Sequence, residues 1–360
     1  MIRNQIKLLD RYIGSNTLLG VLLVLAVLVI LFSFFELLAQ LNDIGKGNFR
    51  LADAFVYTAL TIPKRAVDLM PVSALLGSVV ALGMMADRNE LAAMQAAGMS
   101  AQRISTSVIV SGIILMGTAL LVAEFIAPPL DQHARIRRSR AVRGKTVMIS
   151  KTGFWIRQGR SFIHVGQTLS PDRAADIEIY KTDESGRFKQ FIYAKNAEIL
   201  NGNNWRLTDV EQKIISGDII THQQLADYRL NAFLSRDQMQ ILKLPPDSLA
   251  LTDLYAYIRS LKKRQQNVEA HDLAFWQKIC QPITTSIMVL LSLTFIFGPT
   301  RMKSAGRRIA GGVLVGTLFY LTNQILGHLG LLLNIPPMLT TLTPVALILF
   351  VALRLLRRVY

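Results

Sequence analysis

The sequence predicts an α-helical membrane protein with six transmembrane helices, arranged three plus three on either side of an inserted antiparallel β domain. The first observation is that Asp, Glu, Lys and Arg are absent from five long stretches, at 12–35, 69–86, 104–123, 279–300 and 309–353. A helix needs roughly 20 apolar residues to cross a bilayer. The last stretch is about twice that length and is interrupted only at 334–337, so it accounts for two spans. The second observation is that the segment between the third and fourth stretches is long, rich in charge and patterned like strands.

The composition also indicates a membrane protein, and it changes how the high positive charge is interpreted. Of the 360 residues 51% are hydrophobic, and the mean hydropathy is +0.35, which excludes an ordinary soluble domain. In a soluble protein the formal charge of +16 would suggest nucleic acid. Here basic residues crowd the span ends, where they anchor to anionic headgroups, so we expect membrane lipids and no nucleic acid as partners. The single cysteine, Cys280, lies in a span, so the insert can hold no disulfide and no thiolate metal site.

The chain begins with a segment typical of a short interfacial helix. In residues 1–14 apolar side chains recur at helical spacing, with Arg3, Lys7 and Arg11 between them. The apolar run from Thr17 to Phe35 is too long for the core of a signal peptide. We therefore expect the short helix to lead into the first of the six spans.

The distribution of basic residues predicts that both termini are cytoplasmic. The pieces that would then lie inside, 1–11, 87–103, 299–308 and 354–360, carry twelve Lys and Arg, against four in the short outer pieces. The insert then lies outside the inner face. The segment 131–145 conflicts with this balance, because it places six basic residues beside a span on the outer side.

That basic segment is a candidate binding site for phosphate or carboxylate groups. Arginine forks bind both well, and Lys64 and Arg65 lie on the other outer loop. A solvated stretch that anchors the span is the alternative. The cluster in 131–145 consists of Arg135, Arg137, Arg138, Arg140, Arg143 and Lys145.

The segment 87–101, between the second and third spans, predicts a short amphipathic helix. Leu91, Met94 and Gln95 would share one side, Asp87 and Glu90 would suit the positive end of the helix dipole, and Gly98 would end the helix. An ordinary loop helix is the alternative to a docking element.

The insert predicts short strands separated by turns, typical of an antiparallel sandwich or roll. Turn residues occur at 158–159, 184–186 and 201–204. After Pro245-Pro246 the segment 252–265 predicts a helix that returns to the membrane, with Thr252 as its N-cap. The strand candidates are 154–156, 161–165, 176–180, 191–194 and 205–207.

Catalytic and ion-coupling signals are scarce. The chain has no His-Glu-x-x-His and no Gly-x-Ser-x-Gly motif, and its five histidines are scattered, so we expect no metal site and no enzymatic activity. No ionisable residue but His328 lies within a span, which argues against ion-coupled transport. The span-end carboxylates Glu36, Asp68 and Glu124 are expected to be solvated. In the fifth span Gly311, Gly312 and Gly316 predict a close-packing helix face.

Five stretches together resemble one known family, the LptF/LptG permeases of the lipopolysaccharide export transporter, and most closely its LptG branch. The resemblance covers the whole chain in order, with the insert in the expected place. The stretches are Leu9-Asp10-Arg11-Tyr12-Ile13-Gly14; Arg88-Asn89-Glu90-Leu91 with Ala97-Gly98-Met99-Ser100; Glu124-Phe125-Ile126-Ala127-Pro128; Phe295-Ile296-Phe297-Gly298-Pro299-Thr300-Arg301; and Asn334-Ile335-Pro336-Pro337.

The resemblance implies a permease subunit of an ABC transporter that extracts lipopolysaccharide from the bacterial inner membrane and drives it toward the outer membrane. The implied partners are LptF, a dimer of the ATPase LptB, LptC and, through it, LptA. ATP would act through LptB, with no cofactor bound by this chain. The implied layout is a multi-pass membrane protein with residues 1–130 as the first three spans, 131–270 as a periplasmic β-jellyroll-like domain with its connections, and 271–360 as the last three spans.

The resemblance also assigns roles to the candidate residues. It implies that 87–101 is the coupling helix that docks on LptB, through Arg88, Glu90 and Leu91. Lys64, Arg135 and Arg138 would contact lipid A phosphates. Some relatives carry lysines at the outer end of the first span, where this chain has Glu36, Asn42 and Asp43; Arg137, Arg140 or Lys46 would then compensate. A four-span mechanotransmission subunit and a membrane scaffold without transport are the alternative functions.

Overall fold

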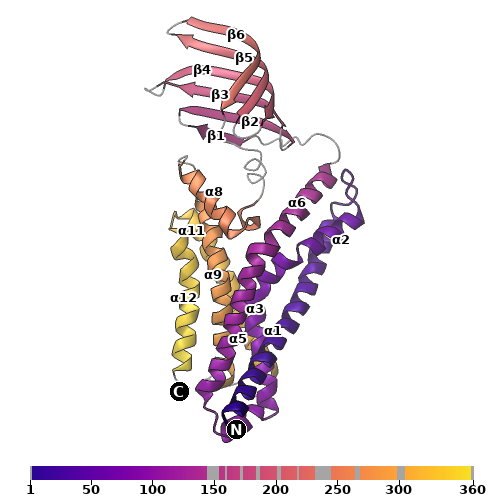
Figure 1. The fold of residues 1–360 in the computed structure, drawn as a ribbon, viewed down its shortest axis with the longest axis vertical. Coiled ribbons are helices and arrows are strands. Elements are labelled where there is room, and N and C mark those ends of the chain that lie inside the picture. Colours follow the sequence, from indigo (N-terminus) through magenta and orange to yellow (C-terminus); the bar gives the residue numbers. More distant parts are fainter. Residues whose placement is uncertain are drawn as a thin grey trace.

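A bundle of long helices carries a curved antiparallel sheet beyond one of its ends (Figure 1). The chain begins and ends at the opposite end of the bundle (Figure 1). The computed structural model describes residues 2–143, 154–158, 160–170, 173–183, 187–200, 204–216, 219–231, 245–263, 268–297 and 305–357.

Among the described residues six helical segments are long and apolar enough to cross a membrane, which agrees with the predicted number. The third span continues without interruption through a five-residue π-helical segment, η1, into α6. The helices are α1 (Ile2–Leu41), α2 (Leu51–Leu60), α3 (Ile62–Asp87), α4 (Glu90–Ala96), α5 (Ala101–Leu121), η1 (Val122–Ile126), α6 (Ala127–Arg143), the 3-10 turn η2 (Pro246–Ser248), α8 (Leu251–Lys263), α9 (Glu269–Ser292), α10 (Thr294–Phe297), α11 (Ala305–Leu332) and α12 (Pro337–Leu356).

The first helix differs from the prediction of a separate interfacial helix. α1 runs unbroken into the span because neither Gly14 nor the hydroxyl residues interrupt it. The Thr17 hydroxyl donates to the Ile13 carbonyl within the helix (2.9 Å), so its polar group is satisfied there. The predicted break between the last two spans is confirmed, with Asn334 in the left-handed region (φ 53°) and Pro337 opening α12.

The centre of the bundle is formed by α3 and α9, which pack against each other. Within the most apolar 18-residue stretch of each span, 61% of the residues are buried in α3 and 72% in α9. The corresponding shares are 22% in α1 and 11% in α11. α1 and α11 both pack on α3, so the first and fifth spans are neighbours of the second. The core cluster around Ile13, Leu75 and Met288 joins these helices.

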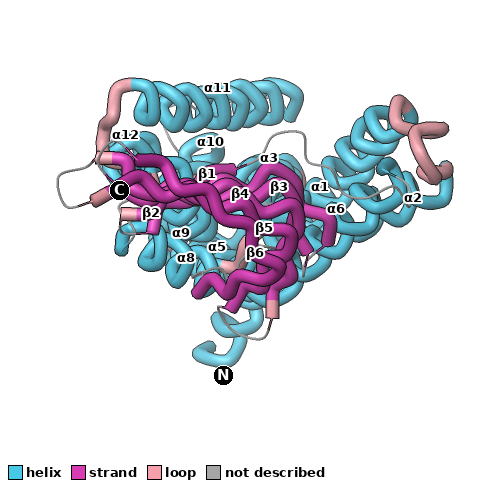
Figure 2. Tube along the Cα trace, turned by 90° about the horizontal axis from the view of Figure 1, so that it is seen from above, coloured by secondary structure: helices cyan, strands magenta, loops and turns pink. Residues whose placement is uncertain are grey.

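The described part of the insert forms one six-stranded sheet in which each strand pairs antiparallel with the next along the chain. Its buried face holds Ile163, Ile179 and Ile192 in register across β2, β3 and β4. Figure 2 shows the sheet lying over the helix ends when it is seen from above. The strands are β1 (Phe154–Gln158), β2 (Ser161–Ser170), β3 (Arg173–Thr182), β4 (Phe188–Ile199), β5 (Asn204–Ser216) and β6 (Ile219–Asn231).

All five strand candidates fall within β1 to β5, so the inserted antiparallel domain is confirmed. β6 was not predicted from the sequence. Most of its side chains are exposed and polar, so its residues show no alternation of apolar and polar side chains. Backbone pairing with β5 along its whole length places β6 in the sheet. The predicted turn residues at 159, 184–186 and 201–203 lie outside the described residues.

Candidate functional site

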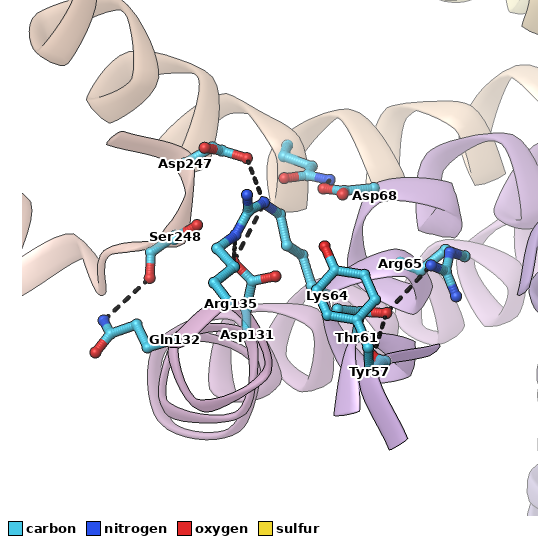
Figure 3. Close-up of polar contacts among 11 residues, drawn as sticks. Tyr57, Thr61, Lys64, Arg65, Asp68, Asp131, Gln132, Arg135, Asp247 and Ser248 are labelled. Atoms are coloured by element: carbon cyan, nitrogen blue, oxygen red, sulfur yellow. Dashed lines mark hydrogen bonds and ion pairs between the residues drawn. The ribbon is translucent and has the colours of Figure 1, made fainter. Parts of the chain in front are cut away.

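At the end of the bundle that faces the sheet, two cations and two carboxylates from three segments form one network (Figure 3). Lys64 lies in the first turn of α3 and pairs with Asp247 of η2 and, at 3.6 Å, with Asp131 of α6. Arg135 lies one turn after Asp131 and donates to it at 2.8 Å. Its guanidinium also lies 3.9 Å from Asp247. We refer to these four residues as the outer network.

The outer network holds the segment that returns from the sheet. The Gln132 side chain donates to the Ser248 carbonyl at 3.1 Å, next to the ion pair of Asp247. Partial burial raises the pKa of Asp247, but the charge and hydrogen bond of Lys64, with Arg135, outweigh it and leave the pKa below its ordinary value. A cavity of about 120 Å³ lies beside these groups, and Lys278 and Ser248 also line it.

Glu124, expected to be solvated, closes the N-terminus of α8 instead. Its carboxylate accepts the backbone N–H of Leu251 at 2.8 Å and the N–H and hydroxyl of Thr252 at 3.2 and 2.7 Å. The prediction that Thr252 is the N-cap is therefore wrong, since Thr252 lies inside the first turn and donates. The Glu124 carboxylate, from a span distant in sequence, accepts the free N–H groups at the start of α8, a role that was predicted for the Thr252 side chain.

A second group of ion pairs surrounds the loop after α1. Asp43 accepts from Lys46 at 2.7 Å and from Arg138, and these two contacts hold the pKa of Asp43 below its ordinary value. The Arg138 guanidinium lies over the Tyr57 ring, 5.6 Å from its centroid. Arg137 pairs with Asp53 of α2 at 3.3 Å.

The structure thus gives a carboxylate partner to each candidate phosphate ligand whose side chain it describes. Lys46, Arg137 and Arg138 keep exposed fractions of 60%, 56% and 39%, whereas Lys64 keeps 19% and Arg135 33%. The side chains of Arg140 and Arg143, and all of Lys145, lie outside the described residues. Sequence reasoning missed the acidic partners Asp53, Asp131 and Asp247; only the Asp131–Arg135 spacing of four residues on a helix was a usable signal.

The other two span-end carboxylates also have partners. Glu36 lies 3.6 Å from Arg65 and accepts from Gln40 at 2.7 Å, while Asp68 accepts from Gln281 at 3.3 Å. The expectation that these groups are only solvated is wrong, because packing of neighbouring helices brings polar side chains to them.

The segment between α3 and α5 contains a shorter helix than predicted. Asp87 ends α3, Asn89 takes a left-handed conformation (φ 57°), and α4 starts at Glu90. At the other end Gly98 (φ 92°) stops α4 as predicted, with the Met99 N–H bonded to the Met94 carbonyl at 3.0 Å.

Within this segment the three predicted docking residues differ in exposure. Leu91 is buried in the core cluster, Arg88 is 67% exposed and Glu90 accepts from the Tyr12 hydroxyl at 3.0 Å. Gln95, predicted to share one side with Leu91 and Met94, is exposed, whereas Leu91 and Met94 are buried.

A buried arginine ties the start of α11 to the residue at which α3 ends. Arg308 donates to Asp87 at 2.6 Å and to the Gly83 carbonyl at 3.3 Å, and only 7% of its side chain is exposed. A Cβ on Gly83 would lie 3.1 Å from the Arg308 Nε. Nothing in the local sequence indicated this contact, which joins residues 221 positions apart.

The predicted glycine face of α11 packs on α3. A Cβ on Gly312 would lie 3.0 Å from the Leu76 side chain, and one on Gly316 would lie 3.5 Å from Val72, while Gly311 is half-buried. A tighter crossing, which the sequence analysis missed, joins α1 and α3. A Cβ on Gly20 would lie 2.7 Å from the Gly77 carbonyl, and one on Gly77 would lie 2.6 Å from the Gly20 carbonyl.

Several spans present long apolar faces that the described residues leave uncovered, and α1 and α11 are the two that also pack on the buried α3. On α1 Leu23, Val27 and Ile30 are 60–70% exposed, and on α11 Leu314 and Leu318 are 71% and 63% exposed. Both helices pack on α3.

Among the residues that the structure describes, no three His, Cys, Asp or Glu side chains gather closely enough to hold a metal ion. The described residues offer two kinds of contact to a ligand, namely apolar faces along the spans and paired charges at the sheet end.

Comparison with known proteins identifies relatives over nearly the whole chain. The family described as "Lipopolysaccharide export system permease LptF/LptG" matches residues 11–358. The lipopolysaccharide export system permease protein LptG of Haemophilus influenzae is 35% identical over 342 residues, covering 94% of this chain and 95% of the relative. The protein of the same name from Escherichia coli strain K12 is 33% identical over 352 residues, covering 97% and 98%.

Proposed function

This chain belongs to the LptF/LptG family of lipopolysaccharide export permeases, and we propose that it is the LptG-type subunit of an ABC transporter that extracts lipopolysaccharide from the inner membrane. It is a multi-pass inner-membrane protein of six spans. The observation that carries the proposal is the pair of exposed apolar faces on α1 and α11, on either side of the buried α3.

The physical problem in this export is the transfer of several acyl chains out of a bilayer. Each CH₂ group that leaves an apolar environment costs about 0.8 kcal/mol. A receiving surface must therefore be apolar over a length similar to that of the chains. The faces of α1 and α11 provide such a surface, and a second permease, LptF, would close the cavity around it.

We propose that the cations at the sheet end contact the lipid A phosphates. How readily each cation can exchange its carboxylate partner for a phosphate depends on how exposed its ion pair is. Lys46, Arg137 and Arg138 are the more exposed, and an exposed ion pair contributes only about 0–1 kcal/mol, so a phosphate can compete with their carboxylates. Lys64 and Arg135 share the buried Asp131, whose carboxylate would lose its partners if they moved. They would contact phosphate while they remain in the outer network.

We further propose that α4 docks on the ATPase LptB. Because Leu91 is buried within this chain, it would hold α4 in place, and the docking face would be Arg88 with the exposed Ala92, Gln95 and Ala96. α4 lies at the end of the bundle where both termini lie, which the distribution of basic residues assigns to the cytoplasm. The sheet would then be periplasmic, where LptC and LptA would bind.

The test is site-specific photo-crosslinking to lipopolysaccharide in living cells. We expect crosslinks from a photoreactive residue at Ile30 of α1 and at Leu318 of α11. Phe350 of α12 is a matched control, because it is 60% exposed on a helix that packs against α9 and α11. Equal crosslinking at all three positions, or none at Ile30 and Leu318, would contradict a lipid-receiving surface and favour the mechanotransmission or scaffold alternatives.

A further inference from the structure

A groove of about 840 Å³ lies between α1 and α5, near the end of the bundle where the chain begins. It is lined by residues of the first turns of α5 and of the part of α1 around Gly14. Its lining includes none of the residues of the outer network, and it lies at the opposite end of the spans.

The entrance of the groove is cationic. Arg11 is exposed there, and Arg103 is 44% exposed. Asp10 accepts from the Arg103 Nη2 at 2.9 Å and from the Ser107 hydroxyl at 2.9 Å, so both carboxylate oxygens are engaged. Asp10 thereby orients the guanidinium and leaves the entrance with a net positive charge from Arg11.

The start of α5 adds to this positive end. Ser100 caps the helix, with its hydroxyl oxygen accepting the Arg103 N–H at 3.3 Å, and the 21-residue α5 directs the positive end of its dipole to the entrance. An anionic group at this place would meet a helix N-terminus and arginine donors together.

Further along the spans the groove becomes apolar. Val110 and Ile114 are 50% and 48% exposed, and Leu18 of α1 faces the same groove. Ile114 lies 11 residues after Arg103, or about 16 Å along the helix. Between the two ends the lining is small and hydroxylated, with Ser15 and Thr106, which leaves the groove open.

We propose that this groove is a binding site for one anionic phospholipid of the leaflet at this end of the spans. Its phosphate would lie against Arg11 and Arg103, and an acyl chain would follow Leu18, Val110 and Ile114. The change from cationic to apolar along one groove matches an amphiphile with an anionic head. A partner helix in the same groove would have to bring its own carboxylate for Arg11, because Asp10 is already engaged by Arg103 and Ser107. The proposal concerns a resident lipid and does not depend on the exported cargo.

Native mass spectrometry of the full chain, purified in detergent with its bound subunits, tests the proposal. Dioleoylphosphatidylglycerol and dioleoylphosphatidylcholine are titrated separately, and we expect the anionic lipid to bind the first site more tightly. Arg11→Gln should weaken that binding about fivefold, the effect of one basic residue near an anionic lipid surface. Thr106→Trp, which fills the groove from an exposed position, should remove the tight binding.

Arg354→Gln is the matched control, because Arg354 is an exposed arginine in the last turn of another span, α12. It should leave the affinity unchanged. Equal affinity for the two lipids would overturn the proposal. So would an unchanged affinity in both Arg11→Gln and Thr106→Trp, or an equal loss in the control, since general attraction of basic residues would then explain the binding. Melting temperatures of the variants show that each is folded.

Discussion

At the scale of single residues, the cations at the sheet end of the bundle are paired with carboxylates and do not form a free cationic surface. Asp131 has only 2% of its side chain exposed and serves both Lys64 and Arg135, while Asp43 serves both Lys46 and Arg138. The carboxylates hold these cations in fixed positions. Pre-positioned donors lower the entropy cost of binding an anion, although the anion must share them.

The cap that Glu124 provides for α8 predicts a local effect on stability. Glu124→Ala removes the acceptor of three hydrogen bonds, and loss of a helix cap costs about 0.5–2 kcal/mol. We expect faster amide hydrogen exchange in residues 251–254 and a lower melting temperature. Thr252→Val removes only the hydroxyl contact and should have a smaller effect. Unchanged exchange in Glu124→Ala would show that α8 does not need this cap.

Asp247 predicts an acid-sensitive contact. Its pKa lies below the ordinary value of 3.8, so its ion pairs stabilise the fold above that value, and this contribution is lost as the pH falls through the folded-state pKa. We expect the melting temperature of the wild type to fall below about pH 4 more steeply than that of Asp247→Asn. Melts in detergent between about pH 3 and 7 measure this. Parallel curves for the two proteins would contradict the contribution of Asp247.

At the scale of elements, the position of each span is decided by how closely its neighbour can approach. Gly20 and Gly77 let the backbones of α1 and α3 touch, whereas Gly312 and Gly316 of α11 meet the ends of flexible side chains. The first crossing is therefore the less tolerant one. This difference matters because α1 and α11 both carry exposed apolar faces, and each contacts α3 through its own glycines.

Alanine substitutions at three glycines separate these contacts. Gly77→Ala places a Cβ 2.6 Å from the Gly20 carbonyl, and such overpacking costs about 1–3 kcal/mol. Gly312→Ala should cost less, because the Leu76 side chain can move. Gly117→Ala on α5 meets nothing within 4 Å and should be neutral or stabilising. Thermal unfolding of the purified variants gives the order, and a Gly77→Ala protein as stable as the wild type would refute the backbone contact.

At the scale of the whole molecule, polar contacts connect the spans to one another and to the segment that returns from the sheet. Arg308 joins the start of α11 to the end of α3, immediately before α4. The outer network and Glu124 join the spans to the segment that returns from the sheet. The end of α3 before α4 is thus in contact with α11 through Asp87 and Arg308, and α3 contacts the sheet connection through Lys64 and Asp247.

The Asp87–Arg308 pair predicts a defect in coupling. Arg308→Met leaves Asp87 without its partner, at a cost of roughly 1 kcal/mol because Asp87 is half exposed. We expect the purified complex to retain ATP hydrolysis but to export several-fold less lipopolysaccharide per ATP, measured in reconstituted liposomes. The single variant Asp87→Glu keeps Arg308 and the negative charge, so it should retain most of the export. An unchanged ratio of export to hydrolysis in Arg308→Met would exclude a coupling role.

The sequence by itself determined the six spans, the place of the insert, the break before Pro337 and the end of α4 at Gly98. These follow from local physics, because charge is excluded from a bilayer over about 20 consecutive residues and glycine or proline acts on its own turn. The distant carboxylate partners of Lys64, Arg137 and Arg138, the cap on α8, the crossing of Gly20 with Gly77 and the inward position of Leu91 were decided only by the tertiary structure. Each depends on two segments distant in sequence and close in space, and no local pattern of one segment records the other.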